Sequence, residues 1–173
     1  MATMTAQPET TAAGSTRTDE RAGKYLTFHL GSEEFGIRVL QVREIMGLQD
    51  ITAVPQTPPH VKGVINLRGK VIPVLCLRAK FGLEPAEYTA RTCIIVVQVQ
   101  GAAGVIQVGV IVDAVSEVLN VVPGEIEDTP DFGRGATPYL LGMAKIKDKV
   151  KILLDIDQVV GAQDILNLQD MAA

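Results

Sequence analysis

The chain contains an internal repeat, in which five positions of the first half recur in the same order 73 residues later. The recurring positions carry glycine, aliphatic residues and a glutamate: Gly36, Val39, Val42, Glu44 and Ile45 correspond to Gly109, Val112, Val115, Glu117 and Val118. A pattern that occurs twice predicts two supersecondary units of similar structure, which constrains the fold more than any single motif does.

The repeat continues further along the chain with an offset of 79 residues. Lys70-Val71 corresponds to Lys149-Val150, and Val74, Leu75 and Leu77 correspond to Leu153, Leu154 and Ile156. The Pro- and Gly-rich stretch 123–142 is where we expect the extra residues of the second half. Both halves are dominated by Val, Ile and Gly and have few segments with helical periodicity. We therefore predict an all-β protein with two small barrels, at residues 24–88 and 89–160.

The segments around these units are less regular. Residues 1–23 are rich in Thr and Ala and lack periodicity, so we expect a disordered tail. Leu26, Phe28 and Leu30 alternate with polar residues, as in a half-buried strand. Residues 39–46 have spacings that fit either a helical turn or a strand, and residues 161–173 are predicted to be a tail or a short helix.

The composition excludes several classes of protein. A net charge of −4 with 4% aromatic residues argues against a nucleic-acid-binding barrel, which needs a basic groove and stacking platforms. No apolar run approaches the roughly 20 residues of a membrane span, so we expect no direct membrane insertion. The acidic N-terminal stretch is no secretory signal, and two cysteines inside apolar segments fit a reduced, cytoplasmic protein.

The sequence offers no catalytic constellation. His29 falls on the polar face of a strand and His60 follows two prolines, and neither belongs to a zinc pattern. Cys76 and Cys93 are flanked by aliphatic residues that raise a thiol pKa and favour core packing. Asp113 and Glu117, four residues apart, are interpreted as solvated carboxylates. We expect no catalytic residue, no metal and no cofactor.

Two features suggest binding instead. The apolar segments of residues 62–75 flank the tip Asn66-Leu67-Arg68-Gly69-Lys70, which predicts a β-hairpin with an arginine at its turn. An arginine on a rigid turn can offer a planar, bidentate fork to a carboxylate. Phe132, beside Asp131 in a loop rich in Gly, Pro and charge, either folds onto the core or anchors a partner.

Several separate segments together resemble one known family. They are Tyr25-Leu26-Thr27-Phe28-His29-Leu30-Gly31, Glu34-Phe35-Gly36-Ile37, Val42-Arg43-Glu44-Ile45, Gly63-Val64-Ile65-Asn66-Leu67-Arg68-Gly69, Ile72-Pro73-Val74, Leu77-Arg78-Ala79-Lys80-Phe81-Gly82-Leu83 and Val112-Asp113-Ala114-Val115-Ser116-Glu117-Val118. In this order, over about residues 24–160, they resemble the CheW family of bacterial chemotaxis coupling proteins. The resemblance implies two intertwined five-stranded SH3-like β-barrels with short helical turns.

The resemblance also implies a non-enzymatic adaptor. Family members link the cytoplasmic tips of methyl-accepting chemoreceptors to the regulatory domain of the histidine kinase CheA, in arrays that can include other CheW copies. The chain would then be cytoplasmic and recruited to arrays at the inner face of the membrane. We expect a standalone coupler, because the sequence has no ATP-binding or phosphotransfer segment and no room for a receiver domain.

The site residues follow from the family's motifs. Receptor contact in the family centres on the groove between the barrels and on the Asn-Leu-Arg-Gly hairpin, which implies Val42, Glu44, Gly63, Asn66, Arg68, Val115 and Val118. Kinase contact implies the loop with Asp131 and Phe132. We expect Arg68 and Glu44 to interact at the groove edge. Cys76 is a departure, because the family often has Asp there, whereas the repeat keeps an acid at Asp155.

Two other functions remain open from the sequence. A small-molecule sensor would use the groove between the barrels as a pocket, and a cysteine-dependent enzyme would rest on Cys76 or Cys93.

The two-barrel interpretation makes a further prediction, that eight aliphatic residues of the repeat are largely buried: Ile37, Val39, Val74, Leu75, Val110, Val112, Leu153 and Leu154.

Overall fold

The computed structural model describes residues 20–101, 104–128 and 139–160. This part of the chain is mostly strand: β1 (Gly23–Leu30), β2 (Glu33–Arg38), β3 (Val42–Gly47), β4 (Val61–Leu67), β5 (Lys70–Cys76), β6 (Cys93–Gly101), β7 (Gly104–Val112), β8 (Ala114–Val121), β9 (Ile126–Glu127), β10 (Leu140–Ile146) and β11 (Lys149–Leu154). Two short helices, α2 (Leu77–Lys80) and α3 (Ile156–Val160), follow β5 and β11 at equivalent points of the repeat.

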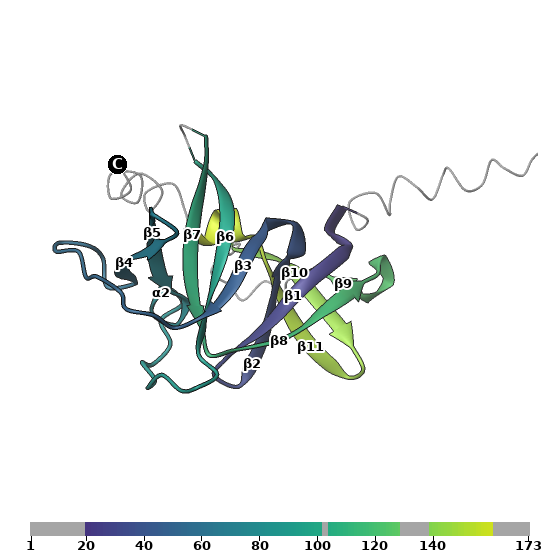
Figure 1. The fold of residues 1–173 in the computed structure, drawn as a ribbon. Helices are drawn as coiled ribbons and strands as arrows, with labels where there is room; N and C mark the ends of the chain where they lie inside the picture. Colours follow the sequence, from purple (N-terminus) through teal and green to yellow (C-terminus); the bar gives the residue numbers. More distant parts are fainter. Residues whose placement is uncertain (1–19, 102–103, 129–138, 161–173) are drawn as a thin grey trace, which may run out of the picture.

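The strands form two sheets that each combine both halves of the sequence (Figure 1). The five-stranded sheet has the order β3-β6-β7-β5-β4, and the six-stranded sheet has the order β8-β1-β2-β11-β10-β9. The predicted all-β, intertwined architecture is thereby confirmed, and the sixth strand is the two-residue β9. The division into sequence units at 24–88 and 89–160 stays a prediction.

Both sheets close on themselves through the segment that follows an end strand. After β3, Thr52 forms two backbone hydrogen bonds with Val64 of β4, at N···O distances of 2.8 and 2.9 Å. In the other sheet β9, which follows β8, pairs with β10 through Met143–Glu127 and Ala144–Ile126. Closure satisfies the backbone groups that an open sheet would leave unpaired at its edges.

Two parallel strand pairs join the halves. In one, Val74 of β5 lies opposite Gly109 of β7, and in the other Leu153 of β11 lies opposite Gly36 of β2. The two pairs are equivalent under the sequence repeat. A Cβ atom on Gly36 would lie 3.3 Å from Leu153 Cδ2, and one on Gly109 would lie 2.8 Å from Ile94 Cγ2. Glycine at both positions therefore lets the side chains of neighbouring strands pack closely.

The core contains the residues that the repeat predicts. Seven of the eight predicted positions are at most 1% exposed: Ile37, Val74, Leu75, Val110, Val112, Leu153 and Leu154. Val39 is half-buried and packs against the cluster that contains Ile37 and Leu75. It lies in a single 3₁₀ turn, Val39–Gln41, that precedes β3, so residues 39–46 combine a short helical turn with a strand.

A buried ion pair accompanies one of the parallel strand pairs. Lys151 of β11 lies opposite Glu34 of β2, and the Lys151 ammonium donates to the Glu34 carboxylate with the lysine 5% exposed. The hydrogen bond from Lys151 is the largest of the effects that lower the Glu34 pKa. Moving either strand by one residue would leave a charge buried without its partner, which is strongly unfavourable, so the pair favours this register.

The predicted tails lie largely outside the described residues, and both remain predictions. Strand β1 begins at Gly23, and Arg21 just before it donates to Asp128 Oδ1 at 3.0 Å. Within the described ranges, none of the helices combines the length and the apolar character that a membrane crossing requires.

Because each sheet contains strands of both halves, we expect the halves to unfold together. Leu75→Ala and Leu154→Ala, at equivalent buried positions of the two sheets, should each lower the free energy of unfolding by about 2–5 kcal/mol. Denaturant unfolding followed by circular dichroism measures this, with Val150→Ala at a half-exposed position as the control. Two separate transitions in either leucine variant would contradict the shared core.

Candidate functional site

Arg68 lies at the tip of the β4–β5 hairpin in a left-handed backbone conformation. Its φ is 52° and that of Gly69 is 86°, so both central residues of the two-residue turn have positive φ, as a type I′ turn requires. Asn66 Oδ1 accepts a hydrogen bond from the Gly69 N–H at 2.9 Å, which fixes the turn from within. A non-glycine residue in this region costs about 1–2 kcal/mol, so the arginine is not there for turn stability.

The Arg68 guanidinium binds the Glu44 carboxylate of β3 with two hydrogen bonds. Nη2 lies 2.6 Å from Oε1 and Nη1 lies 3.3 Å from Oε2. The predicted contact between the two side chains is confirmed. The Arg68 side chain is 73% exposed and that of Glu44 29% exposed. The hydrogen bond from Arg68 is the main cause of a lowered Glu44 pKa.

The equivalent hairpin of the second half repeats the backbone but not the contact. Lys147 has the same φ of 52°, followed by Asp148 at 67°. In the described part of the chain, no ion pair joins Lys147 to Glu117, the counterpart of Glu44. The turn geometry therefore belongs to the repeat, whereas the exposed arginine–carboxylate pair is particular to the first half.

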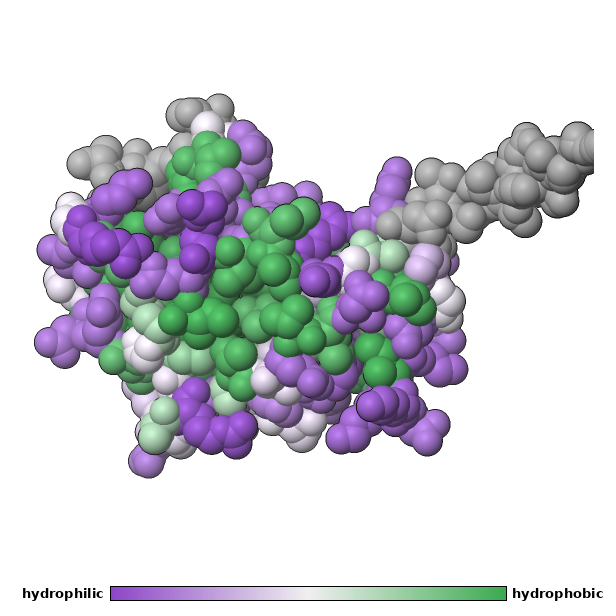
Figure 2. Space-filling model, turned by 45° about the vertical axis from the view of Figure 1, so that its right-hand side comes forward, coloured by the Kyte–Doolittle hydropathy of each residue, from purple (hydrophilic) through white to green (hydrophobic). Residues whose placement is uncertain are grey.

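Apolar side chains form the second part of the candidate site. Val42 of β3 and Val115 of β8 are half-buried against the main core cluster, and Val118 is 54% exposed. Ile45 of β3 is 46% exposed at the position equivalent to Val118. Figure 2 shows hydrophobic residues gathered across the middle of one face, framed by hydrophilic ones. Ile45 was not among the predicted site residues, although the repeat that pairs it with Val118 could have indicated it.

Gly63 acts on the site through the backbone. Its φ is 143°, and a Cβ atom there would lie 2.0 Å from the Thr52 carbonyl oxygen. A side chain at Gly63 would therefore break the bridge between Thr52 and Val64 that closes the first sheet. Asp131 and Phe132, the predicted kinase-binding residues, lie outside the described residues.

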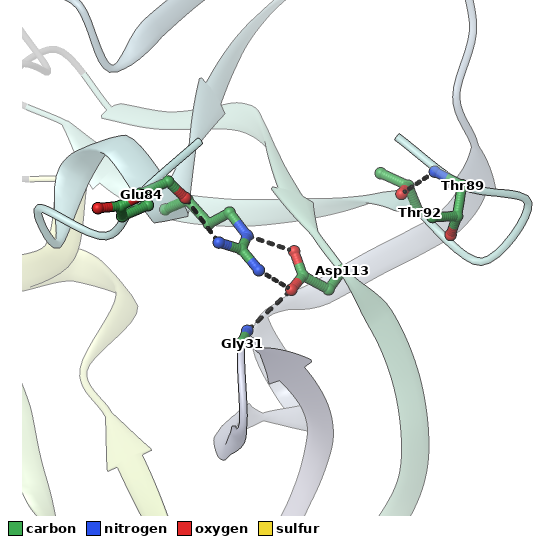
Figure 3. Close-up of polar contacts among 6 residues, drawn as sticks. Gly31, Glu84, Thr89, Thr92 and Asp113 are labelled. Atoms are coloured by element: carbon green, nitrogen blue, oxygen red, sulfur yellow. Dashed lines mark hydrogen bonds and ion pairs between the residues drawn. The ribbon is translucent and has the colours of Figure 1, made fainter. Parts of the chain in front are cut away.

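A second polar cluster ties four segments together (Figure 3). Arg78 of α2 binds Asp113 through Nε–Oδ1 at 2.8 Å and Nη2–Oδ2 at 2.6 Å, and its Nη1 donates to the Glu84 carbonyl at 2.6 Å. Asp113 Oδ2 also accepts from the Gly31 N–H at 2.8 Å. Asp113 is thus paired with Arg78, and its interpretation as a solvated carboxylate was wrong. No local sequence pattern indicates this pair, because the two residues are 35 positions apart.

The cysteines and His29 were the other candidate reactive groups. Burial raises the pKa of the Cys93 thiol, as its aliphatic neighbours predicted, and Cys76 is half-buried. His29 Nε2 lies 3.8 Å from Glu34 Oε2. Among residues 20–101, 104–128 and 139–160, no three His, Cys, Asp or Glu side chains come together as a possible metal site.

The chain is similar in sequence to known proteins. A family model for the CheW-like domain matches residues 24–164. The chain is 36% identical over 150 residues to a Chemotaxis protein CheW of Klebsiella aerogenes, covering 86% of this chain and 88% of that protein. It is 38% identical over 133 residues to a Probable chemotaxis protein CheW of Rhizobium etli, covering 76% and 83%.

A solved structure is also similar. The crystal structure of the scaffolding protein TtCheW from Thermoanaerobacter tengcongensis superposes with a TM-score of 0.73 at 33% sequence identity. The match covers 83% of this chain and 95% of that one.

The Arg78–Asp113 cluster generates a stability prediction. Asp113→Asn should lower the free energy of unfolding by about 1–3 kcal/mol, because charge-assisted hydrogen bonds to a half-buried group are lost. The control is Lys145→Ala, which removes an exposed ion pair with Glu127 that is worth about 0–1 kcal/mol. Chemical unfolding of both variants and of the unmodified chain measures the two losses.

The pH dependence of the same loss has a defined sign. The Arg78 hydrogen bond is the main cause of the lowered Asp113 pKa, so the ionised carboxylate stabilises the folded chain at pH values above the unfolded pKa of about 3.9. The stability difference between the unmodified chain and Asp113→Asn should be complete near neutral pH and shrink as the pH falls through the folded pKa. A difference that stays constant down to pH 3 would contradict this role.

Proposed function

Because the chain belongs to the CheW family of chemotaxis scaffold proteins, we propose that it is a non-catalytic adaptor. In this role it couples the cytoplasmic tips of methyl-accepting chemoreceptors to the histidine kinase CheA. The observation that carries the proposal is the exposed, bidentate Arg68–Glu44 pair.

The energetics of the pair favour a binding role over a folding role. An exposed ion pair contributes little to stability, and this contribution does not exceed the cost of holding Arg68 in a left-handed conformation. What the contact supplies is orientation, because a bidentate carboxylate fixes the guanidinium plane while most of the side chain stays accessible. A fixed and accessible guanidinium suits recognition of a partner's polar groups.

The hydrophobic residues suit the apolar face of a helix, such as a helix of a receptor tip. Val42, Val115 and Val118 would take this face, while Arg68 and Glu44 set its register at the edge. Asn66 through its side-chain oxygen, and Gly63 through its backbone, hold the hairpin in place. Asp131 and Phe132 are proposed to contact the regulatory domain of CheA, and further CheW copies are additional partners within arrays.

The proposed location is the cytoplasm, with recruitment to receptor arrays at the inner face of the membrane. The role requires no cofactor, no nucleic acid and no insertion into the bilayer. The alternative of a small-molecule sensor makes a contrasting prediction. A metabolite that raised the melting temperature while receptor tips and kinase failed to co-sediment with the protein would contradict the adaptor function.

Charge reversal of Arg68 tests the receptor contact. Arg68→Ala and Arg68→Glu should melt within a few degrees of the unmodified chain, yet lose receptor-dependent control of the kinase. An anchor near an interface centre is worth about 2 kcal/mol or more, which is on the order of thirtyfold in affinity. Co-sedimentation with receptor tips measures affinity, and normal coupling by Arg68→Glu would defeat the proposal.

The double variant Arg68→Glu with Glu44→Arg separates two roles of the pair. It restores an ion pair of opposite polarity at the same place. Recovered signalling would show that the pair acts as an internal brace for the hairpin. A folded but inactive double variant would show that Arg68 contacts the receptor directly. Lys147→Glu, on the equivalent turn of the other half, is the matched control and should leave coupling intact.

Phe132→Ala tests the proposed kinase contact. If Phe132 docks on the regulatory domain of CheA, its loss should weaken kinase binding by about tenfold or more while thermal stability stays nearly unchanged. Titration with the isolated kinase domain and a melting curve of the same sample provide the two readouts. A large loss of stability would show instead that Phe132 belongs to the core.

A further inference from the structure

Two side chains from distant elements hold the start of strand β3. β3 begins at Val42, and Gln41 just before it continues the contact with β6 through its side chain, because its Nε2 donates to the Gln98 carbonyl at 3.3 Å. Asp157 of α3 accepts from the Gln100 N–H of the same strand through Oδ1, at 3.2 Å. Gln41 Nε2 also donates to Asp157 Oδ1 at 3.2 Å, so the two side chains form one polar clamp.

The Arg78–Asp113 cluster is the equivalent clamp of the other half. With the 79-residue offset of the repeat, Arg78 of α2 corresponds to Asp157 of α3. Arg78 binds Asp113, which lies directly before β8 and accepts from the Gly31 N–H (Figure 3). The Asp113 N–H in turn donates to the His29 carbonyl at 3.0 Å. A helix side chain thus helps to hold the start of a strand in both halves.

Strand pairing puts the two clamps at the same place in the fold. Val42 of β3 lies opposite Val97 of β6, and its repeat counterpart Val115 of β8 lies opposite Phe28 of β1. Each clamp bonds the carbonyl of the next residue on the facing strand and the N–H two residues further on. Each clamp also joins the two sheets, because α2 follows β5 but holds β8, and α3 follows β11 but holds β3.

We propose that Gln41 and Asp157 are positioning residues for the receptor site, an inference that rests on the proposed adaptor function. Strand β3 contains a β-bulge at Arg43, just after the clamp, because its register with β6 shifts by one residue before Glu44. Bulges re-aim side chains, and a change of one residue in register turns a side chain to the opposite face. The clamp fixes the strand before the bulge, so it keeps Glu44 directed toward Arg68.

The two clamps are not equally firm. Arg78 and Asp113 are joined by two charge-assisted hydrogen bonds at 2.8 and 2.6 Å, whereas the Gln41 amide nitrogen lies 3.2 Å from the Asp157 carboxylate. Strand β3, which carries Glu44, is therefore held by the weaker of the two clamps. A single substitution at this clamp should change the position of β3 while the rest of the frame stays folded.

Charge substitutions in the full-length chain test the proposal. Gln41→Glu places a second carboxylate beside Asp157, and the repulsion should lower the affinity for receptor tips about threefold or more. Adding Asp157→Asn should restore most of this affinity, because the asparagine Oδ1 can accept from the Gln100 N–H while its Nδ2 donates to the new carboxylate. Gln158→Glu, which adds the same charge at an exposed position of α3, is the matched control and should bind receptor tips normally.

A second readout needs no receptor. The NMR signals of the Arg68 guanidinium report its contact with Glu44, and a Glu44→Ala variant gives the signals of the broken contact. Gln41→Glu should move the Arg68 signals toward that reference, the double variant should return them, and Gln158→Glu should leave them in place. Affinity of Gln41→Glu for the isolated kinase domain should stay unchanged.

Two results would overturn the proposal. One is an Arg68 signal and a receptor affinity that both ignore Gln41→Glu. The other is a joint loss of receptor and kinase binding that Asp157→Asn does not restore, because this would indicate general destabilisation. If the unmodified chain fails to bind receptor tips, the adaptor function fails, whereas the Arg68 signals still decide whether the clamp positions Glu44.

Discussion

The structure depends on two parallel strand pairs that join the halves of the chain, β2 with β11 and β5 with β7. Parallel strands need a long crossover connection. The connection from β2 to β11 includes all five strands of the other sheet, and the connection from β5 to β7 includes β6 of the same sheet. Neither half can complete its sheet with its own strands, so contacts between distant residues dominate the core. Because each sheet contains strands of both halves, disruption of one sheet should lower the stability of the other.

The two halves share this frame down to single backbone contacts. The Cys76 N–H donates to the His60 carbonyl at 2.8 Å, and the Asp155 N–H donates to the Tyr139 carbonyl at 2.7 Å. What differs is side-chain chemistry. At the start of α3, Asp155 Oδ1 accepts from the Asp157 N–H, whereas Cys76 provides no such bond at the start of α2. The Arg78–Asp113 ion pair holds α2 in place instead, so the departure from the family pattern at Cys76 is accommodated locally.

The sequence predicted what depends on local pattern and on the repeat. Alternation and internal similarity indicated the strands, the two-barrel architecture and the buried aliphatic positions, while the family resemblance indicated the intertwining and the contact between Arg68 and Glu44. The polar contacts that fix the register were not predictable in this way. Lys151 and Glu34 are 117 residues apart, and Arg78 and Asp113 are 35 apart. No periodicity joins such residues, because their proximity results from strand exchange.

The candidate site shows how the frame positions an exposed group. Arg68 and Glu44 are 24 residues apart on different segments, and they meet only if the β4–β5 hairpin is fixed relative to β3. The bridge between Thr52 and Val64 provides this fixation, and it exists because Gly63 leaves room for the Thr52 carbonyl. The absence of a side chain at Gly63 therefore contributes to the orientation of the Arg68 guanidinium. The exposed pair adds little to stability, but the buried frame determines its orientation, and orientation is what an adaptor must offer to its partners.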